Sequence, residues 1–291
     1  MPEKYDFDDL WDYGDPAGTA EKFRALLPAA EAGGDAEYHA QLLTQLARTQ
    51  GLQRKFEEGH ALLDGVEKLL GSATPVARIR YLLERGRVFN SSKKVEQARP
   101  LFLEAWEQAE AAGEDFYAVD AAHMLGIVEK GAESLAWNEN AIAHATQSKS
   151  ERARGWLGSL LNNTAWTYHD LGEFDKALDL FQQAQAFREE QGNAETIRIA
   201  KWCVGRCLRS LGWYDEALAI QNALLVEAEI EGEPHGYTDE ELGELLLVLG
   251  REDEARSHFA AAYAELSQDA WLVDNEAERV ERLRTLGSIE Q

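Results

Sequence analysis

The sequence has little cysteine and little proline, and it has no long apolar run. Two cysteines in 291 residues, Cys203 and Cys207, exclude a disulfide framework and indicate a reducing compartment, so we expect a cytoplasmic protein. No apolar run reaches the roughly 18 residues of a membrane-spanning helix, and the first residues do not resemble a secretory signal. Only six prolines interrupt long stretches rich in Ala, Leu, Glu, Gln and Arg, which favours helix throughout.

Positive charge is also scarce. The chain has 29 lysines and arginines against 53 aspartates and glutamates, which gives a net charge of -24. Nucleic acids and anionic membranes are bound through clustered Lys and Arg, so we expect neither as a partner.

Motifs of known catalytic centres are missing as well. The sequence contains no glycine-rich phosphate loop, no HExxH helix and no GxSxG elbow, and its histidines do not fall at metal-ligand spacing. Cys203 and Cys207 are four residues apart and could clip a metal, but small apolar residues packed inside a helix pair explain them better. We therefore expect no catalytic residues, no metal and no cofactor, and hence no enzyme.

A repeat organises most of the chain. Its clearest copy is LLNNTAWTYHDLGEFDKALDLFQQA, residues 160–184, in which Ala165 lies seven residues before Gly172, and Ala177 and Phe181 lie five and nine after it. The same spacing recurs around six turns, 38 to 41 residues apart, at Arg54, Lys93, Gly131, Gly172, Gly212 and Gly250. Small residues on both sides of a turn let two antiparallel helices approach, and pairs must stack to bury their apolar faces.

This pattern resembles the tetratricopeptide repeat over roughly residues 36–265. Its period near 40 exceeds the usual 34 and is similar to the longer-helix repeats of kinesin light chains and bacterial peptide-sensing regulators. The N-terminal stretch YDFDDLWDYGDP, together with LLTQLARTQGLQRKFEEGHALLD, also looks like a group of bacterial repeat proteins. Arg54 and Lys93 replace the turn glycine, and the third copy is shortened after Gly131, so these places depart from the pattern.

The resemblance implies an all-α fold, a right-handed α-solenoid of about six helix pairs over residues 15–268. An acidic and aromatic segment, residues 1–14, precedes it, and residues 269–291 close it. We expect an extra helix over 17–32 and a capping helix over 270–287, because solenoid ends need covers.

Two local signals mark helix starts. Asp15 followed by Pro16 predicts an N-cap and a first helical residue. Thr238 and Glu241 have capping-box spacing, which predicts a helix start there after an exposed loop over 229–238.

In this architecture the first helix of each pair lines the inner surface, and residues about thirteen, ten, six and three before each turn face inward. The selected positions are rich in Arg, Trp, His and Asn. The candidate groove residues are Arg48, Arg80, Arg87, Asn90, His123, Lys130, Asn162, Asn163, Trp166, His169, Arg198, Trp202, Arg206 and Arg209.

Tryptophan exposed beside arginine is typical of binding hot spots. Two bland alternatives remain: single arginines often pair with a glutamate one turn away, and Trp166 and Trp202 could simply pack between adjacent helices. The resemblance implies that Asn163 bonds the backbone of a bound peptide, and Asn162 takes this role if the register is off by one.

These features predict a non-enzymatic adaptor or scaffold that holds an acidic peptide segment of a partner protein in a basic and aromatic groove. A sensor of a small molecule or signalling peptide is one alternative. Self-assembly through the solenoid edges or the N-terminal segment is another.

The stretch YDFDDLWDY, residues 5–13, supports two hypotheses. It could dock in the groove of its own chain, or of a neighbour's, as a pseudo-ligand or dimer contact. Alternatively, Phe7, Leu10 and Trp11 cover the apolar edge of the helix over 17–32.

Overall fold

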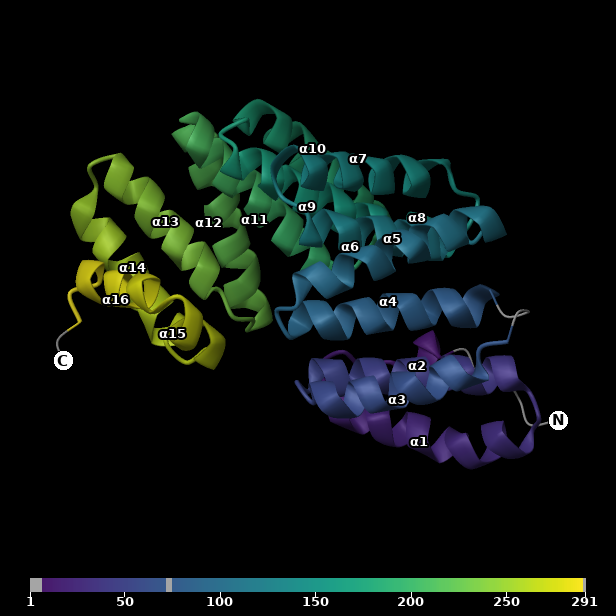
Figure 1. Ribbon diagram of the computed structural model, residues 1–291. Coiled ribbons are helices and arrows are strands. Elements are labelled where there is room, and N and C mark those ends of the chain that lie inside the picture. Colours follow the sequence, from purple (N-terminus) through teal and green to yellow (C-terminus); the bar gives the residue numbers. More distant parts are fainter. Residues whose placement is uncertain (1–6, 72–74, 290–291) are drawn as a thin grey trace. The chain divides into compact units, whose positions relative to one another are not determined.

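The computed structural model describes residues 7–71 and 75–289, and all regular elements in these ranges are helices. Successive helices joined by short turns form antiparallel pairs, as expected for an all-α solenoid (Figure 1). The chain divides into two compact units, residues 1–160 and 161–291, which are described separately below. Among the described residues, no helix combines the length and apolar character needed to cross a membrane.

Unit 1 contains an N-terminal helix followed by three helix pairs. Its helices are η1 (Asp8–Leu10, a 3-10 turn), α1 (Pro16–Ala32), α2 (Ala36–Leu52), α3 (Phe56–Leu69), α4 (Pro75–Ser91), α5 (Val95–Ala112), α6 (Asp115–Val128), α7 (Gly131–Gln147) and α8 (Glu151–Arg154). The pairs are α2–α3, α4–α5 and α6–α7, and α1 packs against α2 as the expected extra helix (Figure 1).

Unit 2 holds the other three pairs and the closing segment. Its helices are α9 (Leu157–Asp170, which begins at the end of unit 1), α10 (Phe174–Gln191), α11 (Ala194–Leu211), α12 (Tyr214–Glu231), α13 (Gly236–Val248), α14 (Glu252–Leu266), α15 (Ala270–Asn275) and α16 (Ala277–Leu286). The capping helix expected over 270–287 is therefore two helices that meet at Glu276. Leu283 of α16 packs with Phe259 and Leu266 of α14.

All six predicted turn residues adopt the left-handed backbone conformation. Gly172, Gly212 and Gly250 have φ angles of 77°, 80° and 73°, and the non-glycine residues Arg54 and Lys93 have φ angles of 60° and 63°. The φ angle of Gly131 is 57°. This conformation is costly for residues that carry a Cβ, so the repeat geometry imposes it on Arg54 and Lys93. The spacing thus located turns that composition alone would have missed.

Close approach between paired helices explains the small residue before each turn. A Cβ on Gly86 would lie 2.4 Å from the ring of Phe102, sixteen residues later. In the third pair the residue against Gly126 is Asn138, only twelve residues later, so this turn is four residues shorter. The third copy is therefore two residues shorter before Gly131 and two residues shorter after it, whereas the sequence predicted a shortening only after Gly131.

The N-cap prediction at Asp15 is confirmed, because its side chain accepts a hydrogen bond from the Gly18 amide at 2.8 Å. The capping-box prediction is wrong, because α13 already begins at Gly236 and Thr238 lies inside it. The loop is correspondingly shorter than 229–238. The cap comes instead from α14, whose Glu265 carboxylate accepts the His235 amide hydrogen at 3.0 Å.

Cys203 and Cys207 are both buried free thiols in the core of unit 2. Burial raises the pKa of Cys203 to about 12 and that of Cys207 to about 11, so both remain protonated at neutral pH. Their role as small core residues is confirmed.

Candidate functional site

Three aromatic side chains form a row on successive first helices of unit 2. Trp166 of α9, Trp202 of α11 and Tyr237 of α13 have ring centroids 6.2 Å and 6.3 Å apart. The Trp202 indole donates a hydrogen bond to the Tyr237 carbonyl oxygen at 3.1 Å. Both tryptophans are half-buried and Tyr237 is 43% exposed, so the row offers aromatic surface to solvent. We call these three residues the aromatic row.

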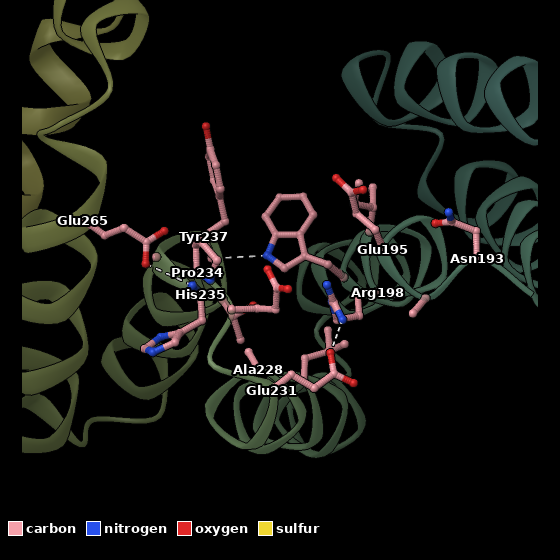
Figure 2. Close-up of a pocket in the computed structure, with 16 residues that line it drawn as sticks. Asn193, Glu195, Arg198, Ala228, Glu231, Pro234, His235, Tyr237 and Glu265 are labelled. Carbon is pink, nitrogen blue, oxygen red and sulfur yellow. Dashed lines mark hydrogen bonds and ion pairs between the residues drawn. The ribbon is translucent and has the colours of Figure 1, made fainter. Parts of the chain in front are cut away.

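A pocket of about 920 Å³ adjoins the aromatic row at Trp202 and Tyr237. Its walls come from the start of α11, the end of α12, the loop 232–235 and the start of α13. In Figure 2, Tyr237 and His235 lie on one side of the pocket and Asn193 and Glu195 lie on the other. The pocket therefore combines an aromatic wall with polar rims.

The polar groups of this pocket are mostly paired and mostly acidic. Arg198 forms an ion pair with Glu231, and the Glu265 carboxylate holds the His235 amide (Figure 2). Glu195 and Glu233 also line it. Four carboxylates thus face one arginine, and the pocket offers no excess of positive charge.

Beside the row, two predicted arginines share one buried carboxylate. Arg209 holds both oxygens of Glu241 at 2.7 and 2.9 Å, and the Nε of Arg206 lies 3.0 Å from Oε1. Arg206 also donates to the Ser210 hydroxyl at 2.7 Å, which lies 2.9 Å from Nε2 of His169. Burial and the nearby Arg206 lower the pKa of His169, which favours the neutral imidazole.

The predicted arginines of unit 1 form a second network with buried carboxylates. Glu84, whose side chain is 3% exposed, lies 3.1 Å from Arg48 and 2.7 Å from Arg87. Arg87 also pairs with Asp120, and the burial cost of its guanidinium is outweighed by these two carboxylates, so its pKa is raised. The network links α2, α4 and α6.

Arg80 and His123 lie close to aromatic rings. The Nε of Arg80 donates to the Tyr117 hydroxyl at 2.6 Å. The ring of His123 lies 5.2 Å from that of Trp156. Burial lowers the pKa of His123, because the charged imidazolium would lose its hydration.

The remaining predicted residues lie outside these networks. Asn90 is half-buried, and its carbonyl oxygen accepts the Lys93 amide hydrogen of the turn at 2.9 Å. Lys130 is exposed and immediately precedes α7. Asn162 is half-buried and Asn163 is exposed, about one turn before Trp166 on α9. Their contact with a peptide stays a prediction.

The sequence did not reveal the carboxylate partners. Glu84 follows Arg48 by 36 residues, Asp120 follows Arg87 by 33, and Glu241 follows Arg209 by 32. These separations are three to six residues shorter than the corresponding repeats of 39, 38 and 38 residues. An acidic residue at that interval after an inward arginine is the signal that could have found these pairs.

The N-terminal segment has contacts of both expected kinds; Tyr5 and Asp6 lie outside the described residues. Phe7 is 4% exposed and packs on Phe23 of α1 and Tyr38 of α2. Trp11 also packs on Phe23, which fits the covering role. The Arg48 guanidinium stacks on Trp11, as a groove residue would stack on a ligand.

A family model of the tetratricopeptide repeat matches residues 158–191, the copy around Gly172. No curated protein sequence matches the chain. Residues 158–191 are therefore a tetratricopeptide repeat, and the other copies, apart from the shorter third one, share its spacing.

Solved structures with the same fold include regulators and kinesin-related repeats. A signal-transduction ATPase with a tetratricopeptide-repeat sensor, from Pyrococcus horikoshii, aligns with a TM-score of 0.74 at 14% identity. The alignment covers 91% of this chain and 42% of that protein. The quorum sensor NprR from B. thuringiensis, in its apo form, aligns at 0.66 with 15% identity, covering 96% and 80% of the two chains.

Kinesin light chain-like repeats from P. anserina align at 0.53 with 18% identity, covering 65% of this chain and 94% of theirs. NprR has also been solved in complex with its cognate peptide NprX. At these identities the likeness shows a shared fold. The chain thus has the fold of tetratricopeptide-repeat proteins.

Proposed function

We propose that this protein of tetratricopeptide-repeat fold is a non-enzymatic, cytoplasmic adaptor that binds a peptide segment of a partner protein. The binding surface is the aromatic row of unit 2 together with the adjoining pocket. The observation that carries this proposal is the continuity of Trp166, Trp202 and Tyr237, which are partly exposed on three successive first helices. Partly exposed aromatic side chains beside a pocket are typical of binding hot spots.

The ion pairs on this surface change the ligand chemistry that the sequence predicted. Because Arg206 and Arg209 are already paired with Glu241, aromatic and apolar contacts are the first source of affinity. An acidic side chain of a ligand would have to compete with Glu241 for these arginines. The acidity of the partner is thus a secondary feature of the proposal.

A sensor of a small molecule or signalling peptide is the second candidate. The pocket of about 920 Å³ favours it, since such a volume accommodates a compact ligand. NprR, a quorum sensor of the same fold, has been solved with its cognate peptide. Both candidates use the same surface, and they differ in whether the ligand belongs to a larger protein.

The test begins with selection of binding peptides from a displayed random library on the full chain. The affinity of a selected peptide is then measured by calorimetry for the unaltered protein and for Trp202→Ala. We expect Trp202→Ala to weaken binding by about tenfold or more, as is usual for a central tryptophan. Trp213→Ala is the matched control, because Trp213 is 49% exposed at the N-cap position before α12 and lies outside the aromatic row.

Equal losses of affinity for Trp202→Ala and Trp213→Ala would contradict the proposed surface. Screening of metabolite-sized compounds by thermal shift separates the second candidate, since only a sensor gains stability from one of them. Light scattering across protein concentrations measures self-assembly, the remaining alternative.

A further inference from the structure

Two aromatic residues of the N-terminal segment rest together on one arginine of unit 1. Trp11 and Tyr13 stack with ring centroids 4.8 Å apart and an angle of 7° between the rings. The guanidinium carbon of Arg48 lies 5.8 Å and 5.5 Å from these two centroids. The Trp11 indole also donates to the Gln45 side-chain oxygen at 2.9 Å. This is a set of contacts that a bound peptide would make.

The segment is held unevenly. Phe7 is buried between Phe23 and Tyr38 and anchors one end. Tyr13, in contrast, is 60% exposed, and Trp11 is half-buried. Cation–π contacts at such exposed positions are individually weak. Displacement of the Trp11–Tyr13 pair would also break the contact of Trp11 with Phe23 and its hydrogen bond to Gln45, but the packing of Phe7 on Phe23 and Tyr38 does not depend on the pair.

Unused hydrogen-bonding capacity lies within the same network. The Nε of Arg48 and the Oε2 of Glu84 are buried, and neither has a hydrogen-bond partner among the described residues. Glu84 itself is 3% exposed. A peptide backbone supplies one acceptor and one donor per residue, which is the complement of these two groups.

We propose that the surface around Arg48 is a second peptide-binding site, and that Trp11 and Tyr13 occupy it as an internal ligand. The external ligand is a segment of a partner protein with two aromatic residues flanking an acidic one, as in Trp11-Asp12-Tyr13. Its rings replace those of Trp11 and Tyr13 on Arg48, and its backbone meets Arg48 Nε and Glu84 Oε2. Because the internal ligand is tethered, its effective concentration at the site is high. A partner segment must therefore bind tightly, or be abundant, to displace it.

The test uses the full chain with Trp11→Ala and Tyr13→Ala, which vacates the site and leaves Phe7 in place. The probe is a fluorescent synthetic peptide with the sequence of residues 9–14, DLWDYG. We expect the vacated protein to bind it about tenfold or more tightly than the unaltered protein, because the internal competitor is gone. Adding Arg48→Gln should abolish this gain.

Arg78→Gln is the matched control, because Arg78 is an arginine of the same unit with a half-exposed side chain that pairs with Glu104 instead. It should leave the gain unchanged. Three results would overturn the proposal: equal weak binding by the vacated and unaltered proteins, a gain that survives Arg48→Gln, or a fall of the melting temperature of the vacated protein by about 10 °C or more. The last would show that the pair is a structural cover.

Discussion

At the scale of single residues, buried carboxylates pair with four of the arginines that the spacing before each turn selected, Arg48, Arg87, Arg206 and Arg209. Glu84, Asp120 and Glu241 are each less than a tenth exposed, and each is paired with at least one arginine. A buried carboxylate without a partner is costly, so removing one arginine is expected to cost more than replacing a whole pair by apolar residues. The arginines are thus part of the folded framework as well as candidates for ligand contact.

Helical spacing before each turn selected the arginines and tryptophans expected to face inward, and their role in a groove stays a prediction. The spacing could not predict which carboxylates pair with these arginines. With 53 acidic residues, a carboxylate near any arginine is expected by composition alone. Arg87 does pair with Glu84 one turn away, but Arg48, Arg87 and Arg209 also have partners 32 to 36 residues away. Only the superposed repeats bring Arg48 to Glu84 or Arg209 to Glu241.

His123 should make the stability of unit 1 sensitive to mild acid. Its pKa is lowered in the folded state by burial, whereas it titrates near 6.5 when unfolded, so the unfolded chain takes up the proton more readily. The stability that His123 contributes is therefore present above pH 6.5. It is lost as the pH falls below 6.5 toward the folded-state pKa.

We expect the free energy of unfolding to fall more steeply from pH 7.5 to pH 5.5 in the unaltered protein than in His123→Gln. Urea unfolding at several pH values measures this difference, and the imidazole proton resonances report the His123 titration directly. Parallel pH profiles for the two proteins would show that this histidine does not contribute.

At the scale of helices and turns, repeat spacing was the most informative part of the sequence. It placed all six turns, including those at Arg54 and Lys93, where no glycine marks them. The capping-box signal failed at the start of α13, where tertiary contacts override it. Glu265 of α14 caps this helix at His235, so the capping potential of Thr238 is not used.

The left-handed conformation of the turn residue predicts opposite changes in stability for two substitutions at equivalent turn positions, one to glycine and one to alanine. Lys93→Gly should stabilise the protein by about 0.5 kcal/mol, because relief of the strain at φ 63° exceeds the entropy that glycine adds to the unfolded chain. Gly172→Ala, at φ 77°, should destabilise it by about 1 kcal/mol. Urea denaturation measures both, and a destabilising Lys93→Gly would refute strain at this turn.

At the scale of the whole molecule, each helix pair depends mainly on its neighbours, as in other solenoids. The six copies could be read from the sequence. The division into two units near residue 160 could not, because it falls at the start of α9, where the repeat pattern continues. No change of composition marks it.

Because each helix pair depends mainly on its neighbours, equivalent core substitutions in the two units should destabilise different helices. Phe102 and Phe259 are fully buried nine residues after their turns, in unit 1 and unit 2. Phe102→Ala, which should cost about 3–5 kcal/mol, is expected to accelerate amide hydrogen exchange in α4–α6 and leave α13 and α14 protected. Phe259→Ala should do the reverse. Faster exchange across both units in either variant would indicate a single cooperative block instead.

Helix α16 forms ion pairs with the acidic residues of α13. Arg279 binds Glu240 through Nε at 2.8 Å, and Arg282 pairs with Glu244, so these two acidic residues of α13 are already neutralised. A further repeat, or the end of a second copy, would have to displace α16 and leave these carboxylates uncompensated. Glu240 and Glu244 are thus held by α16, and a partner that docked on these carboxylates would first have to break both ion pairs.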